Sequence, residues 1–137
     1  MAIDEEQRHR MIRRAVLHAP IALVDESVML WEKLHLVLAA IIGDGGFASL
    51  YARNLHQTQT TFAWLTRHPP QAVQACLAQL RLDLGAQDLD VAGAASAALL
   101  VNFVDTLILL IGELLTTSVL REAWGGDVVN DAGTEAQ

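Results

Sequence analysis

The sequence predicts an all-α protein: a single-domain bundle of about five helices, with one long and very apolar helix at its C-terminal end. Three observations predict this fold class. Apolar residues make up 53% of the 137 residues, and Leu, Ala and Val supply much of that share, which favours helix packing over a sheet. Apolar positions recur three and four residues apart, as one face of a helix requires. Glycine and proline clusters divide the chain into segments of helical length. A globin-like or an orthogonal bundle fits this pattern.

The first predicted helix spans residues 4–18. It opens with three acidic residues, which favour the positive end of a helix dipole, and Ala19-Pro20 ends it because proline cannot continue the hydrogen-bond ladder. The second predicted helix runs to about Ile42. Its apolar stripe consists of Val24, Val28, Trp31, His35, Leu38 and Ile42. The turn Gly43-Asp44-Gly45-Gly46 ends this helix, because glycine accepts backbone conformations that other residues avoid.

The third predicted helix begins near Phe47 and reaches Pro69-Pro70. Thr58, Thr60 and Thr61 are weak helix formers and could loosen its second half. The fourth predicted helix covers about residues 70–84, and Gly85 follows as its stop signal. One face of it carries Val73, Leu77, Leu80 and Leu84.

The last predicted helix runs from about Val91 to Trp124, with Asp88 or Asp90 as its cap. Such a helix has about 33 residues and a length of roughly 50 Å. A globule of this chain length has a diameter of only roughly 37 Å. The helix must therefore kink at Gly93 or Gly112, protrude, or lie along a second subunit. We expect residues 1–124 to form one domain and residues 125–137 to form a disordered acidic tail.

The apolar surface of this last helix predicts a homodimer. Its central seam alternates four-residue and three-residue steps, and the seam positions expected at the interface are Leu100, Val104, Leu107, Ile111 and Leu114. Apolar residues on both sides of the seam widen the surface beyond what one neighbouring helix covers. Two-fold homodimers are the commonest closed assembly, so a second copy is the expected partner. The alternative is a helix central to one subunit and covered on all sides.

The composition limits which classes of binding partner and which cellular location we expect. A net charge of −7 argues against a nucleic-acid partner, because such binding depends on clustered Lys and Arg. Cys76 is the only cysteine, so no disulfide can form within the chain, which suits the cytoplasm. Residues 91–112 carry a single charge, Asp105, and their length would allow a membrane span. A mid-helix carboxylate costs about 2.5–3.5 kcal/mol on insertion, and no basic cluster flanks the segment, so we expect none.

A polar stripe follows one side of the last predicted helix. It consists of Asn102, Asp105, Thr106, Glu113, Thr116 and Thr117. We interpret it as the solvated face, because charged residues are seldom buried without a partner. If Asp105 is covered, Arg53 or Arg81 is the expected counter-ion.

His35 stands on an apolar stripe, where a leucine would be ordinary. We interpret it as a core histidine bonded to a carbonyl, Asn54 or Tyr51. The alternative is an axial haem ligand in an apolar pocket, for which His56 is the competing candidate. His-Glu-x-x-His spacing is absent from the sequence, so we expect no other metal site.

These observations favour a non-catalytic regulatory or interaction module: a homodimeric signalling or ligand-sensing domain. A ligand would lie between the predicted helices, where the candidate residues are Trp31, His35, Tyr51, Arg53, His56, Asn102 and Asp105. In general architecture the chain resembles globin-like sensor domains, and the alternative function is a haem-dependent gas or redox sensor. An enzyme is not expected, because Asp105 and Glu113 would lie about 12 Å apart along the helix, beyond the spacing of paired catalytic carboxylates.

Overall fold

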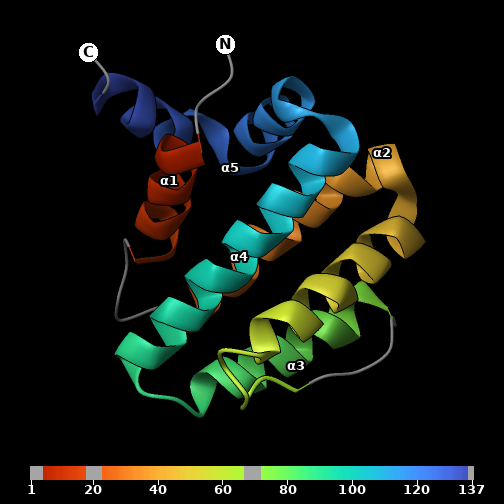
Figure 1. The fold of residues 1–137 in the computed structure, drawn as a ribbon, viewed down its shortest axis with the longest axis vertical. Coiled ribbons are helices and arrows are strands. Elements are labelled where there is room, and N and C mark those ends of the chain that lie inside the picture. Colours follow the sequence, from red (N-terminus) through yellow and green to blue (C-terminus); the bar gives the residue numbers. More distant parts are fainter. Residues whose placement is uncertain (1–4, 18–22, 67–71, 136–137) are drawn as a thin grey trace.

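Five helices form the protein in the computed structural model, which describes residues 5–17, 23–66 and 72–135, with the backbone alone for Met11 and residues 13–17 and 126–135. They are α1 (Glu5–Leu17), α2 (Leu23–Gln59), α3 (Val73–Gly85), α4 (Leu89–Ile111) and α5 (Glu113–Glu135). None of the described residues forms a strand, so the predicted all-α class is confirmed. Figure 1 shows α4 across the centre of the bundle, with α1 and α5 on one side and α3 on the other.

A single glycine turns α2 back on itself. Gly43 has φ +80° and ψ 164°, a region of backbone conformation that is essentially restricted to glycine. The turn separates a first arm, residues 23–42, from a second arm, residues 44–59. In a straight helix Trp31 and Tyr51 would be roughly 30 Å apart. Their ring centroids are instead 5.1 Å apart, so the two arms pack side by side and the predicted break at this turn is confirmed.

The second arm of α2 ends earlier than the sequence predicts. The helix stops at Gln59 instead of continuing to Pro69-Pro70, and Thr60 and Thr61 form turns. The weak helix propensity of threonine accounts for this early end. The predicted breaks at Ala19-Pro20 and within residues 69–70 lie outside the described residues. In α3, the predicted apolar face of Val73, Leu77, Leu80 and Leu84 is buried.

The prediction of one helix over residues 91–124 is wrong. Gly112 has φ +88° and ψ 163°, and the chain turns there from α4 into α5. A kink at this glycine solves the length problem without a second subunit. The long apolar helix is α4, which lies in the middle of the chain and contacts each of the other four helices.

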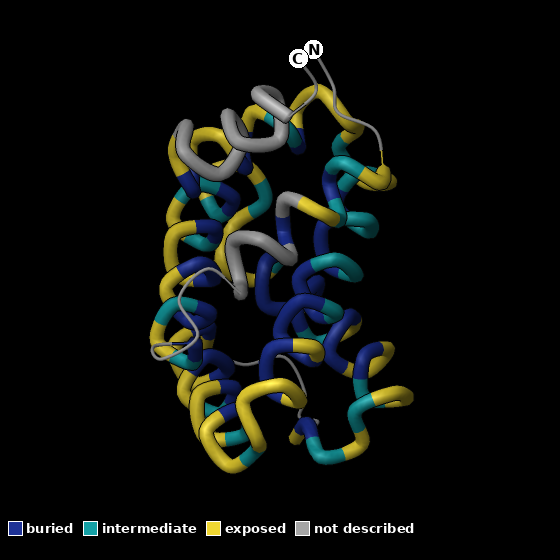
Figure 2. The backbone as a smooth tube through the Cα atoms, turned by 90° about the vertical axis from the view of Figure 1, so that its left-hand side faces the viewer, coloured by how far each residue is buried: buried dark blue, intermediate teal, exposed yellow. Residues whose placement is uncertain are grey.

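The core lies where α4 crosses the two arms of α2. Trp31 is fully buried and meets Phe47, Tyr51 and Phe103 edge to face, with centroid distances between 4.9 and 6.3 Å. In Figure 2 the buried positions of the helices face one another and the exposed positions face outward. The indole Nε1 of Trp124 donates a hydrogen bond of 3.0 Å to the Leu30 carbonyl, which fastens α5 to α2.

Two described helices, α2 and α4, are long and apolar enough to cross a membrane by length and composition. The core helix of a soluble protein passes the same test, and the location in the cytoplasm stays a prediction. Helix α5 continues beyond a third glycine corner, Gly125 with φ +76°, to Glu135. The side chains after Gly125 are outside the described residues, so the disordered acidic tail also stays a prediction.

Candidate functional site

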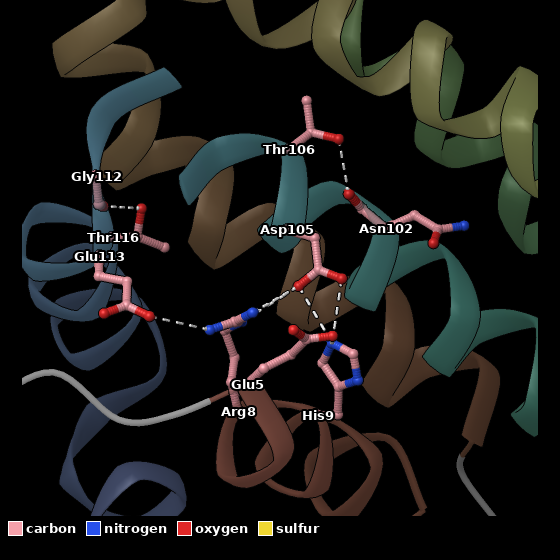
Figure 3. Close-up of polar contacts among 9 residues, drawn as sticks. All are labelled: Glu5, Arg8, His9, Asn102, Asp105, Thr106, Gly112, Glu113 and Thr116. Atoms are coloured by element: carbon pink, nitrogen blue, oxygen red, sulfur yellow. Dashed lines mark hydrogen bonds and ion pairs between the residues drawn. The ribbon is translucent and has the colours of Figure 1, made fainter. Parts of the chain in front are cut away.

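A polar cluster joins α1 to α4 and α5, and we call it the α1 clamp: Arg8, His9, Asp105 and Glu113 (Figure 3). The Arg8 guanidinium donates hydrogen bonds to Asp105 Oδ1 from Nη2 at 2.9 Å and from Nε at 3.3 Å. Its other terminal nitrogen, Nη1, lies 3.9 Å from Glu113 Oε1. Arg8 therefore bridges a carboxylate on α4 and one on α5, two of the helices against which α1 packs.

Burial makes the Arg8 contacts obligatory. The Arg8 side chain is only 7% exposed, and a buried charge is tolerated only when it is paired and hydrogen-bonded. Asp105 is covered by α1, so its counter-ion is Arg8, and the prediction of Arg53 or Arg81 is wrong. Arg81 instead forms an ion pair with Asp25, on the surface between α3 and α2.

His9 holds the other side of the Asp105 carboxylate. Its Nε2 lies 3.1 Å from Oδ2 and 3.2 Å from Oδ1, and it donates to the carboxylate because a carboxylate only accepts. Glu5, one turn earlier on α1, places Oε1 3.9 Å from the same nitrogen. Ligand atoms of Glu5, His9 and Asp105 all lie within 4.8 Å of one another, so these three residues could hold a metal ion.

A hollow of about 650 Å³ lies beside the α1 clamp. Helix α4 forms its floor, because Gly93, Ala94, Ala97 and Ala98 carry too little side chain to fill the space in front of them. Leu23, Leu89 and Val101 add apolar walls. Among the described residues, the polar lining consists of Asp90, Asn102 and His9, the last of which also belongs to the clamp. This volume and this mainly apolar lining are typical of sites for small ligands.

The polar stripe of α4 and α5 is not a single solvated face. Thr106 lies 2.9 Å from Asn54 Oδ1, and Asn102 Nδ2 donates a hydrogen bond of 2.9 Å to Thr58 Oγ1, so both residues face the second arm of α2. Asp105 faces α1 instead. Thr116 is buried and donates to the Gly112 carbonyl, while Glu113 and Leu109 are exposed. Two neighbouring helices, α1 and α2, thus cover the part of the stripe that lies on α4.

His35 is held by the residue that follows the corner of α2. Its Nε2 lies 2.8 Å from Asp44 Oδ1, and its ring packs against Phe47 at a centroid distance of 5.0 Å. None of the expected partners, a carbonyl, Asn54 or Tyr51, is among its described hydrogen bonds. His35 lines two neighbouring hollows of about 510 and 370 Å³ that border α3. His56 and Arg53 are exposed on the second arm of α2.

Trp31 and Tyr51 belong to the core, and they line none of the hollows described above. Trp31 Nε1 and the Tyr51 hydroxyl are buried without a hydrogen-bond partner among the described residues. Burial first, and then the nearby Cys76 and Asp83, raise the pKa of Tyr51 far above its usual value of 10. The phenol is therefore neutral at physiological pH.

The expected dimer seam divides into two parts. Leu100, Val104 and Leu107 are fully buried within one copy, so they are not available to a second copy. Ile111 is half-buried and Leu114 is 68% exposed. Four exposed leucines surround the turn at Gly112, and we call them the leucine corner: Leu109, Leu110, Leu114 and Leu115.

Arg8 and His9 contribute most to the clamp, but the sequence patterns did not single them out. They lie 97 and 96 residues from Asp105, so local patterning could not pair them. Two signals could have found them: Glu5 and His9 share one face of a helix, and Asp105 needed a cation from another element. The clamp can fasten α1, and the hollow beside it can receive a small ligand. No protein family, curated protein or solved structure with which the chain was compared matches it.

Proposed function

We propose that the protein is a non-catalytic, cytoplasmic ligand-sensing module that binds a small, mainly apolar molecule in the hollow between α1 and α4. The observation that carries the proposal is the lining of this hollow. Its floor is built from glycine and alanine, and His9 and Asn102 supply polar groups that would orient a hydrogen-bonding end of the ligand.

The α1 clamp supplies the regulatory part of the proposal. His9 lines the hollow and also contacts Asp105, which in turn pairs with Arg8. A ligand that moves His9 therefore acts on the contacts that hold α1 against α4 and α5. Occupied and vacant states would differ in how firmly α1 is docked, and a two-state element of this kind is what a switch requires.

Titration with Nile red, a neutral apolar dye, tests the hollow. We expect the native protein to bind the dye and enhance its fluorescence. Ala94 is exposed and lines the hollow, so Ala94→Leu fills the space without entering the core and should remove most of the enhancement. Ala75→Leu on α3, where Ala75 is also exposed, is the matched control and should bind as the native protein does. Equal binding by both variants would defeat the proposal.

We further propose that two copies associate through the leucine corner. Leu109 is 86% exposed and Leu114 is 68% exposed, and clustered apolar surface of this kind marks interaction sites. Light scattering after size exclusion should give twice the mass of one chain. Leu110→Glu with Leu114→Glu should give a monomer, whereas Leu82→Glu, at an exposed leucine on α3, should not. A native protein that is monomeric at micromolar concentration overturns the dimer.

A haem-dependent sensor is the second candidate, and one observation favours it: His35 lines two adjoining hollows. An iron ligand at Nε2 would have to displace Asp44, which now occupies that nitrogen. An absorption scan after haem addition tests this candidate. A Soret shift that disappears in His35→Ala supports it, and a shift that survives both His35→Ala and His56→Ala defeats it.

A further inference from the structure

Glu5, His9 and Asp105 bring one imidazole nitrogen and two carboxylates together at the edge of the hollow. The imidazole Nε2 is 3.1 Å from Asp105 Oδ2 and 3.9 Å from Glu5 Oε1. Around an ion with bonds of about 2.0–2.2 Å, tetrahedral ligand atoms are roughly 3.4 Å apart. One of the two observed distances is slightly shorter than this value and the other is slightly longer. Small side-chain rotations therefore suffice to place the His9 nitrogen and the two carboxylate oxygens around one ion.

Charge favours a cation at this position. Among the side chains that the structure describes in this cluster, Asp105 and Glu113 flank the Arg8 guanidinium and Glu5 lies beside His9, so three carboxylates accompany one guanidinium. With His9 neutral, the group carries two negative charges in excess, which a divalent cation would neutralise. In the absence of an ion, the contact between His9 and Asp105 is made through a proton on Nε2. A metal ion would replace that proton.

Arg8 orients the Asp105 carboxylate without occupying all of it. Both of its hydrogen bonds go to Oδ1, so Oδ2 remains for an ion. Arg8 is buried, and it therefore cannot turn away to solvent. Hydrogen bonds of this kind to the second oxygen of a ligating carboxylate are an ordinary feature of metal sites.

We propose that Glu5, His9 and Asp105 bind one divalent transition-metal ion of the zinc type at the edge of the hollow. The imidazole selects such an ion over Mg²⁺ and Ca²⁺, which prefer oxygen ligands alone. Three protein ligands leave a coordination position open, and His9 lines the hollow, so that position is available to a small ligand there. The site goes beyond the proposed ligand-binding function and does not depend on it.

Calorimetric titration of the metal-stripped 137-residue chain with Zn²⁺ at neutral pH, with no organic ligand present, tests the site. We expect one Zn²⁺ per chain. Glu5→Gln and His9→Gln should each weaken binding by about tenfold or more, because even outer partners of metal ligands contribute about 10–100-fold. The Glu5 side chain is 74% exposed, so Glu5→Gln leaves the fold intact even if His9→Gln loosens α1.

His35→Gln is the matched control, because His35 has a carboxylate partner in Asp44 but lies outside the three-ligand cluster. It should bind Zn²⁺ as the native protein does. In addition, Zn²⁺ should shift the ring ¹⁵N signals of His9 in a long-range ¹H–¹⁵N spectrum of the five histidines. Absence of saturable binding, undiminished binding in Glu5→Gln, or a shift at another histidine in place of His9 overturns the proposal.

Discussion

At the scale of single residues, the core holds buried polar atoms whose effect on the free energy of unfolding can be measured. The Tyr51 hydroxyl is buried without a partner among the described residues, although its ring packs well against Trp31. An unsatisfied buried hydroxyl destabilises the folded state, because the unfolded chain lets it bond to water. At Tyr51, the packing of the buried ring therefore stabilises the folded state, whereas the unpaired hydroxyl destabilises it.

Tyr51→Phe should raise the free energy of unfolding at pH 7 by about 1–3 kcal/mol, because it removes the unpaired hydroxyl and keeps the ring. Urea denaturation of both proteins measures the difference. A loss of stability greater than about 1 kcal/mol would show that the hydroxyl has a partner in solution.

Tyr51 also predicts a pH dependence. Its pKa is raised in the folded protein, so above the usual value of 10 the unfolded chain releases the phenol proton first. The free energy of unfolding should therefore fall as pH rises beyond that value, and this part of the decline should be missing in Tyr51→Phe. Tyr51 is the only tyrosine, so tyrosinate absorbance reports its ionisation directly. Parallel declines in the two proteins would contradict the assignment.

A buried serine pair gives a second prediction at this scale. Ser96 Oγ donates a hydrogen bond of 2.8 Å to Ser27 Oγ, and both residues are fully buried between α4 and α2. Ser27→Ala and Ser96→Ala should each lower the free energy of unfolding by about 1–3 kcal/mol, because each leaves a buried hydroxyl unpaired. The double variant should lose less stability than the two single variants together. Urea denaturation of the native protein, the two single variants and the double variant measures that coupling. Strict additivity would show that the two hydroxyls act independently.

At the scale of elements, glycine corners decide where helices end. Gly43, Gly112 and Gly125 have φ between +76° and +88°, and each joins two helical segments without an intervening loop. Other residues pay a steric cost in this region of backbone space. Two of these corners bring polar side chains together: Gly43 brings Asp44 to His35, and Gly112 places Glu113 of the α1 clamp near Arg8.

Gly43→Ala and Gly112→Ala should each destabilise the protein by about 1–3 kcal/mol. No neighbouring atom lies within 4 Å of an added Cβ at either position, so backbone strain is the only cause. Gly45→Ala is the matched control, since Gly45 is equally open but has no positive φ, and it should be neutral or stabilising by up to about 1 kcal/mol. Chemical denaturation of the three variants measures the contrast, and equal effects at all three would refute it.

At the scale of the whole molecule, the α1 clamp determines how firmly α1 is attached to the rest of the bundle. Helix α1 packs on both α4 and α5, and Arg8 pairs with a carboxylate from each. Loss of this pairing should release α1 locally before the remaining helices unfold.

Asp105→Ala should lower the free energy of unfolding by about 1.5–3 kcal/mol, because it leaves the buried Arg8 charge without its main partner. Hydrogen exchange in metal-free buffer should show faster exchange in α1 and little change in α3. Asp25→Ala is the control: it removes an exposed ion pair with Arg81, and such pairs contribute about 0–1 kcal/mol. Equal acceleration in α1 and α3 would mean that α1 is not a separately released element.

The sequence by itself determined the helical class, the buried face of α3 and the breaks at Gly43 and Gly112, of which the second was foreseen only as a possible kink. These features are local: apolar spacing, propensity and glycine conformation act over a few residues. Tertiary structure alone decided that the Leu100, Val104 and Leu107 face of α4 is buried within one copy, that Arg8 pairs with Asp105 across 97 residues, and that a hollow lies in front of Gly93 and Ala97. No local pattern specifies such contacts, because they depend on how whole helices cross once the chain has turned at its corners.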